Sequence, residues 1–144
     1  MSETWVLVAN SSSARFFILQ SRHEPLLELE GMVHSEGRMR EQDEVTDRQG
    51  SIAGGHGEGA HNFESPDLKQ HEAEVFARQI AHKLELGRTQ NDYHKLVIVA
   101  SPAFLGVLRQ VLNNHVLDLV SVSLDKNLVE EDESVIREHI LAVS

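Results

Sequence analysis

The chain has 144 residues and carries 13 basic against 23 acidic side chains, which gives a formal net charge of −10. A hydrophobic share of 40% is enough for one folded core, and the length leaves no room for a second full domain. The absence of cysteine excludes disulfide scaffolds, thiolate metal sites and cysteine nucleophiles. We therefore expect one acidic domain over residues 1–144.

The compartment follows from what the sequence lacks. The first residues show neither the basic region nor the apolar segment of a signal peptide, and the longest apolar runs are far shorter than a membrane span. The acid excess argues against broad binding to phosphate backbones, because such binding takes clustered Lys and Arg. We expect a cytoplasmic protein with no membrane, DNA or cofactor partner, and the pattern leaves its oligomeric state open.

The first 33 residues are typical of β-structure. An apolar run at residues 5–9, the polar turn Asn10–Ser13 and a β-rich run at residues 15–19 together predict a hairpin. The turn suits side chains that hydrogen-bond their own backbone, so its serines are interpreted as turn formers rather than nucleophiles. Apolar residues between 26 and 33 predict a third strand, which Gly31 interrupts.

Residues 34–66 break this pattern. They hold six of the nine glycines, and seven acidic against three basic side chains. A connection this long is uncommon inside a compact domain and is usually a functional loop or a disordered insertion. We expect a long, Gly-rich, flexible loop and look there first for function.

A long helix is predicted to begin at Ser65-Pro66, because serine caps helices and proline fits the first helical position. Apolar residues recur between 73 and 84 at the spacing of one buried helical stripe, and Gly87 is predicted to end the helix. The continuous apolar run within residues 94–100 favours a strand that is covered on both faces.

The rest of the chain repeats this alternation. Ser101-Pro102 predicts the start of a second helix, which Asn113-Asn114 is expected to close. Val116–Leu124 is predicted to be a strand with Val120, Val122 and Leu124 on one face. The last helix is expected over residues 130–142, where Glu130–Glu133 would form a solvated first turn.

The predicted order is therefore βββ, long loop, αβαβα. Hairpin-linked strands followed by alternating helices and strands predict an α/β domain with a mixed sheet and helices packed on it. This order matches the ribonuclease-H-like class.

Four stretches resemble the bacterial host-attachment proteins, namely Trp5–Phe17, Glu72–Ala81, Leu96–Leu105 and Val122–Leu128. The resemblance covers nearly the whole chain except the loop and implies a role in surface association. It also implies kinship with the central domain of archaeal and eukaryotic peptide-chain release factors, which has a ribonuclease-H-like fold and a Gly-Gly-Gln loop before its long helix. That kinship implies the ribosome, so the two functional implications conflict.

The place of the release-factor loop is occupied here by Gly54, Gly55 and His56. In release factors the glutamine backbone N–H stabilises the attack of water on the peptidyl-tRNA ester, and the resemblance assigns that contribution to the N–H of His56. His56 lacks the glutamine side chain, and the acid excess opposes entry into a cavity walled by RNA phosphates. A hydrolytic loop, a non-catalytic ribosome- or partner-binding loop and a solvated insertion all stay open.

Histidines in and beside the loop invite a metal interpretation. His56, His61 and His71 could supply nitrogen ligands for zinc or nickel, but their spacing matches no strong metal motif. The strands offer few carboxylates, which argues against a two-metal nuclease. We therefore expect no metal, with these three histidines as the weak candidates.

The leading hypothesis is a stand-alone, release-factor-like member of the host-attachment family that acts through the loop Gly50–Phe63. Its partners would be the ribosome, tRNA or another protein. Whether the protein is an enzyme stays open, and the sequence favours a protein without catalytic activity. If it does catalyse a reaction, we expect peptidyl-tRNA ester hydrolysis. The alternative is a non-enzymatic binding protein that contributes to attachment to host cells or surfaces.

Overall fold

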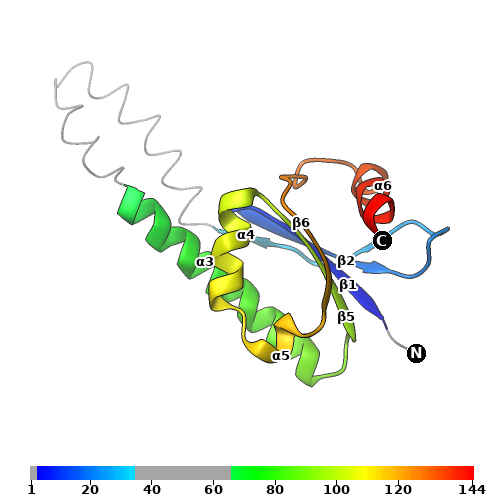
Figure 1. Ribbon diagram of the computed structural model, residues 1–144, viewed down its shortest axis with the longest axis horizontal. Coiled ribbons are helices and arrows are strands. Elements are labelled where there is room, and N and C mark those ends of the chain that lie inside the picture. The colour runs from blue at the N-terminus through cyan, green and yellow to red at the C-terminus, as the bar shows by residue number, and fades with distance from the viewer. Residues whose placement is uncertain (1–2, 35–65) are drawn as a thin grey trace, which may run out of the picture.

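The computed structural model describes residues 3–34 and 66–144. Its elements carry the labels of Figure 1. In chain order they are β1 (Thr4–Ala9), β2 (Ser13–Leu19), β3 (Leu27–Glu28), β4 (Met32–Val33), α3 (Pro66–Thr89), β5 (Lys95–Ala100), α4 (Pro102–Val111), α5 (Asn114–Leu117), β6 (Val120–Leu124) and α6 (Glu133–Val143). The mixed α/β architecture expected from the sequence is confirmed.

One mixed sheet organises these elements. Its strand order is β3-β2-β1-β5-β6, and β4 also pairs with β2. Strand β1 runs antiparallel to β2 and parallel to β5, which in turn runs parallel to β6. The predicted hairpin is therefore confirmed, and the apolar run before residue 100 forms an internal strand, as expected.

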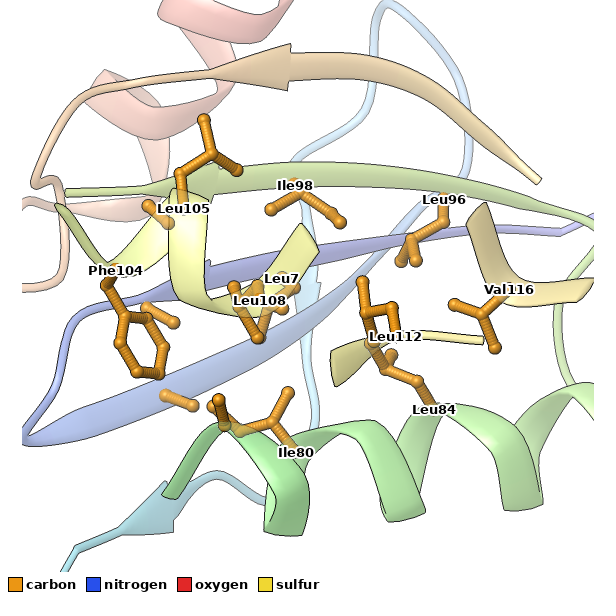
Figure 2. Packing of buried hydrophobic residues seen from close by; sticks show 14 of the residues in the cluster. Leu7, Ile80, Leu84, Leu96, Ile98, Phe104, Leu105, Leu108, Leu112 and Val116 are labelled. Carbon is orange, nitrogen blue, oxygen red and sulfur yellow. The ribbon is translucent and has the colours of Figure 1, made fainter. Parts of the chain in front are cut away.

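The helices cover both faces of the sheet unequally. Helices α3, α4 and α5 lie on one face and α6 lies alone on the other (Figure 1). Side chains of β1 alternate between the faces, since Trp5 and Leu7 join the first core while Val6 and Val8 join the second. Figure 2 shows Leu7 of β1 in the first core together with Ile80 of α3 and Leu108 of α4.

The predicted third strand is two short strands. The chain pairs with β2 as β3, leaves it, and pairs again as β4. Gly31 lies between them, where an added Cβ would stand 2.7 Å from the carbonyl oxygen of Ala14. Only glycine fits so close to the neighbouring backbone at this break between the two strands.

The long helix begins at Pro66 as predicted, but the expectation that Gly87 ends it is wrong. Helix α3 continues to Thr89, and Asn91, with φ of 61°, supplies the left-handed residue that follows it. The amide of Asp92 donates to the carbonyl of Gly87 at 2.8 Å, and the amide of Asn91 to that of Arg88 at 3.1 Å. This is a Schellman termination with asparagine in place of glycine.

Gly87 has a packing role instead. A Cβ at this position would lie 2.8 Å from Cη2 of Trp5 and 3.1 Å from Cε1 of Tyr93. The two aromatic rings stack at 4.8 Å and occupy the space that a side chain would need. Glycine is therefore required here by the neighbouring rings rather than by the backbone.

Two boundaries around α5 also differ from expectation. Helix α4 ends at Val111, just before Asn113, as expected. Asn113 also begins a further helix, because its side chain accepts a hydrogen bond from the amide of Val116 at 2.9 Å. The following strand is only Val120–Leu124, and its register against β5 shifts between Leu96 and Val97. The shift sends Val120 to the first core and Val122 to the second, so the prediction of one shared face is wrong.

The last helix begins at Glu133 rather than at residue 130. Its first turn is not merely solvated, because the carboxylate of Glu133 accepts the amide of Leu26 at 2.9 Å and pairs with Arg137 at 3.2 Å. A side chain interpreted as solvent-facing thus ties α6 to the segment before β3.

Candidate functional site

The carboxyl ends of the three parallel strands meet at one edge of the sheet. Ala9 of β1 pairs with Ala100 of β5, and Leu124 closes β6 beside them. In open α/β sheets, ligands bind outside this edge. Polar segments follow each of these strands here, namely Asn10–Ser13, Ser101 and Asp125–Asn127. We take this carboxyl edge as the candidate site.

Asn10 organises the edge. Its Oδ1 accepts the amides of Ser12 at 2.8 Å and Ser13 at 3.0 Å, which confirms that the turn bonds its own backbone. Its Nδ2 donates to Oδ1 of Asn127 at 3.3 Å. One amide side chain therefore fixes the first turn and connects it to the segment that leaves β6.

The amino end of α4 opens on the same edge. The amide of Ser101 donates to the carbonyl of Ala9 at 3.3 Å, and Pro102 takes the first helical position, as the sequence predicts. The Ser101 side chain makes no capping hydrogen bond, and the first turn of α4 holds no acidic residue. The partial positive charge at the amino end of α4 is therefore not compensated by a carboxylate in the first turn of the helix.

His34 lies at the same edge and is the one buried polar residue among those that the structure describes. It is 3% exposed, its ring lies 5.1 Å from that of Phe76, and its amide donates to the carbonyl of Ser12 at 2.9 Å. In the described part of the chain its Nε2 is buried and has no hydrogen-bond partner. Such atoms are rare in folded proteins.

Sequence reasoning missed His34. It appeared only as the boundary of the long loop, and a single histidine after a two-residue strand gives no periodic signal. Its burial depends on Phe76 of α3, which is 42 residues away along the chain. Only the packing of α3 on β4 identifies this imidazole.

The predicted site residues Gly54, Gly55 and His56 lie outside the described residues, as does His61 and the rest of the loop Gly50–Phe63. His71 lies on α3 and is exposed. Within residues 3–34 and 66–144, no three His, Asp or Glu side chains are placed to hold a metal ion. His71 therefore gains no ligand partners from the described residues.

The chemistry available at the carboxyl edge is that of hydrogen bonding. It offers serine hydroxyls, two asparagine amides, a helix amino end and one imidazole. Across the part of the chain that the structure covers, no serine hydroxyl hydrogen-bonds the imidazole ring of a histidine, which a serine–histidine nucleophile would require. The edge is suited to holding a polar or anionic group.

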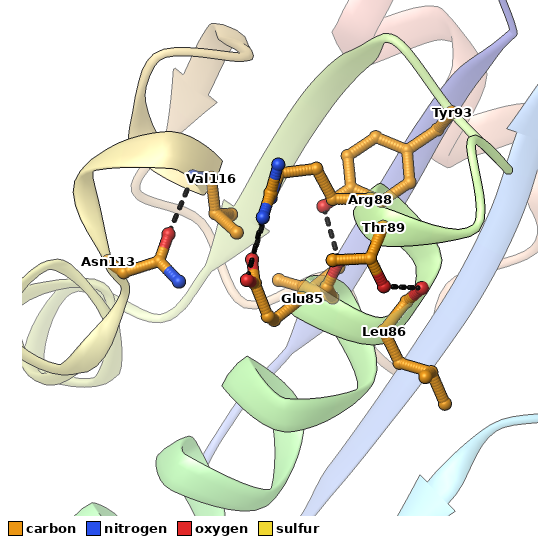
Figure 3. A network of polar contacts seen from close by, with 8 residues as sticks. Glu85, Leu86, Arg88, Thr89, Tyr93, Asn113 and Val116 are labelled. Atoms are coloured by element: carbon orange, nitrogen blue, oxygen red, sulfur yellow. Dashed lines mark hydrogen bonds and ion pairs between the residues drawn. The ribbon is translucent and has the colours of Figure 1, made fainter.

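The opposite edge of the sheet is fixed by a polar network (Figure 3). Arg88 donates to both carboxylate oxygens of Glu85 at 2.7 Å, and the hydroxyl of Tyr93 donates to the carbonyl of Leu84 at 2.6 Å. The hydrogen bonds from Arg88 and then from Asn113 lower the pKa of Glu85 to about 2. Burial raises the pKa of Tyr93 to about 12.

A small cavity of about 210 Å³ opens beside this network, lined in part by Arg88, His94, His115 and Asp118. The bidentate pair holds Arg88 against Glu85, so its guanidinium is already engaged. The charged groups of this edge are therefore paired with each other, whereas at the carboxyl edge Nε2 of His34 is buried and has no partner among the described residues.

One comparison places the chain among known proteins. In the described ranges, no helix is long and apolar enough to cross a bilayer. No curated protein matches the sequence. The sequence profile of one family, described as "Protein required for attachment to host cells", matches residues 5–140. Because the match spans both cores and the carboxyl edge, the chain belongs to this host-attachment family.

Proposed function

We propose that this protein is a binding module that contributes to attachment to host cells, with the carboxyl edge of its parallel strands as the binding surface. The family description supports the attachment role. The observation that carries the choice of surface is the unpaired, buried Nε2 of His34. A buried polar atom without a partner costs stability, so its retention is explained if a bound group supplies the partner.

The test separates folding from binding by replacing His34 with a residue of similar shape. His34→Phe removes the unpaired nitrogen and keeps an aromatic ring against Phe76, so the thermal midpoint stays equal or rises. Bacteria that lack the gene are complemented with wild type, with His34→Phe and with Arg109→Ala, an exposed change on α4. Their adhesion to cultured host cells is counted.

We expect wild type and Arg109→Ala to restore adhesion and the stable His34→Phe protein to fail. Full adhesion with His34→Phe would remove the carboxyl edge from the proposal. Loss of adhesion without the gene, restored by every variant, would keep the attachment role and place its surface elsewhere.

A second candidate is the release-factor-like, translation-associated function with a ribonuclease-H-like fold. The strand order favours it, since β2 pairs antiparallel with the first of three parallel strands and the long helix follows residues 35–65. If this module acts chemically, Gly54 and Gly55 allow close approach and the N–H of His56 positions water for peptidyl-tRNA ester hydrolysis.

Sedimentation with ribosomes from the same cells tests this candidate. Wild type and a variant lacking residues 50–63 are compared at low and at physiological salt, because salt screens association that rests on charge alone. Loop-dependent sedimentation that survives physiological salt would lead to a hydrolysis assay of the Gly54→Ala, Gly55→Ala double variant. No association at either salt would eliminate the translation role.

A further inference from the structure

A groove of about 860 Å³ lies between α3 and the chain that joins β3 to β4, and its strand side adjoins the carboxyl edge. Its lining is mainly apolar and includes Met32 on the strand side and Val75 and Leu86 on α3. The groove lining shares no residue with the carboxyl edge, so the inference below does not rest on the proposed function.

Helix α3 carries a second stripe that faces this groove. Val75, Gln79, His82 and Leu86 recur at i, i+4, i+7 and i+11, offset from the stripe that packs into the first core. Leu86 is 49% exposed, and Figure 3 shows its side chain directed away from the Glu85–Arg88 network. A single exposed leucine is ordinary, but one that joins other apolar side chains in a groove marks a contact surface.

Charge in the groove is the reverse of that in the whole chain. The lining holds two cations, Arg78 and Lys83, and one carboxylate, Glu30, whereas the chain has 13 basic against 23 acidic residues. Arg78 pairs with Glu74 at a long distance of 3.5 Å, and its side chain is 60% exposed. Such an exposed ion pair is weak and leaves the guanidinium available to a ligand.

Lys83 is held in place at the groove. Its Nζ donates to the carbonyl oxygen of Glu30 at 3.0 Å and lies 4.6 Å from the centre of the Phe16 ring. These contacts fix a side chain that is otherwise flexible, and an ammonium has three donors, of which this hydrogen bond takes one. A carboxylate that enters the groove therefore meets a preorganised cation.

The strand beside the groove has backbone groups that no described residue pairs. The amide of His34 bonds the carbonyl of Ser12, so the adjacent pair, Val33 with Ser13, is a non-hydrogen-bonded pair of the ladder. Within the described residues β4 is an edge strand, so the N–H and C=O of Val33 point outward. An extended segment can pair there while its side chains reach the groove.

Other occupants fit less well. The groove is open along one side, so a small amphiphile would keep much of its apolar surface in water. A net charge of −10 repels an anionic bilayer, and a bilayer is too flat to fill a groove. A two-fold contact with a second copy would bring the cations of both grooves together.

We propose that this groove binds an extended peptide segment of another protein that combines apolar and acidic side chains. The apolar side chains lie against Val75, Leu86 and Met32, and the carboxylates pair with Arg78 and Lys83. Partner contact of this kind buries the exposed leucine and neutralises the local positive charge.

The probe is a random heptapeptide library displayed on phage. Selection uses the full-length wild-type protein, with counter-selection against the Arg78→Glu, Leu86→Asp double variant. We expect the enriched peptides to combine Asp or Glu with Leu, Ile or Phe. A labelled peptide from the enriched set is then titrated by fluorescence anisotropy.

Each groove variant has a matched control elsewhere. Arg109→Glu makes the same charge change as Arg78→Glu, and Val143→Asp replaces a helical apolar residue that is 53% exposed. We expect the groove variants to weaken binding by about tenfold or more, the loss of one good contact, and the controls by less than about twofold. The altered positions are exposed, so circular dichroism should show every variant folded.

Enriched peptides without acidic residues, or equal binding by the groove and control variants, would overturn the proposal. A wild-type dimer that Leu86→Asp dissociates would assign the groove to a second copy. Binding to phosphatidylserine vesicles that Arg78→Glu abolishes would assign it to a membrane.

Discussion

The two faces of the sheet differ in how they are held. Helices α3, α4 and α5 cover the first face, with a core that includes Ile80, Leu84 and Leu108. Helix α6 covers the second face alone, with Ile136 and Ile140 as its fully buried residues. The same strands supply both cores, so the difference lies entirely in what packs on them.

The second face is fastened by charge-assisted hydrogen bonds. Arg15 donates to the carbonyls of Val129 and Glu131 at 2.8 Å each and to both oxygens of Glu28. Glu133 accepts the amide of Leu26 at 2.9 Å. These polar contacts add to the few buried residues by which the short helix α6 and the segment before it are held on the sheet.

The largest expected effect compares one isoleucine from each face. Ile80→Ala should lower the free energy of unfolding by about 2–5 kcal/mol, because it leaves a cavity between α3 and the sheet. Ile140 is equally buried, but Ile140→Ala should lower the free energy of global unfolding by less, because α6 can detach from a sheet that remains folded. Urea denaturation gives both values.

Hydrogen exchange sharpens this comparison. In wild type, the amides of α6 should exchange before those of α3. Equal exchange in both helices, together with equal losses for Ile80→Ala and Ile140→Ala, would mean that the two faces unfold as one unit.

The second largest loss of stability is expected when the hydrogen bonds of Arg15 are removed. Arg15→Ala should destabilise the protein by about 1.5–3 kcal/mol, the range for hydrogen bonds that involve a charged group. Arg15→Lys should recover little, because an ammonium cannot match the planar fork that reaches Glu28 and two carbonyls. Thermal denaturation is the measurement, with the exposed Arg78→Ala as control. Full recovery by lysine would contradict the role of fork geometry.

Two glycines test packing on the first face. Gly87→Ala should cost about 1–3 kcal/mol, since the new methyl group meets Trp5 and Tyr93, which are stacked and buried. Gly106→Ala on α4 has no atom within 4 Å and should stabilise by about 0.5–1 kcal/mol. Relative to wild type, the denaturation midpoint should fall for Gly87→Ala and rise for Gly106→Ala. A neutral or stabilising Gly87→Ala would show that the rings can move.

The smallest effect is a pH dependence at Glu85. Its pKa is about 2 when folded against an ordinary value of 4.5, so its stabilisation is complete above pH 4.5 and is lost as the pH falls toward 2. The Glu85→Gln variant should therefore lose less stability than wild type across this window. Thermal midpoints measured between pH 5 and 2.5 check this, with the exposed Glu138→Gln as control. Parallel curves for wild type and Glu85→Gln would contradict the assignment.

The sequence predicted much of the fold and little of the site. The hairpin, the buried stripe of α3 and the internal strand β5 follow from local periodicity and are confirmed. The glycine motif proposed from the release-factor resemblance, Gly54 to His56, lies outside the described residues and stays a prediction. His34 carries no local signal, and the groove beside Leu86 forms only where residues 30–32 face α3, so sequence reasoning did not find them.

The sequence by itself determined which segments form helices and strands and which side of each is apolar. Hydrophobic periodicity and helix capping depend only on residues that are close along the chain. Tertiary structure decided where the faces meet. Residue 87 of α3 must be glycine because Trp5, 82 residues earlier, fills the place of its side chain. Likewise, the shifted register of β6 on β5 divides its valines between two cores. These outcomes depend on contacts between distant segments, and a local pattern along the chain does not encode them.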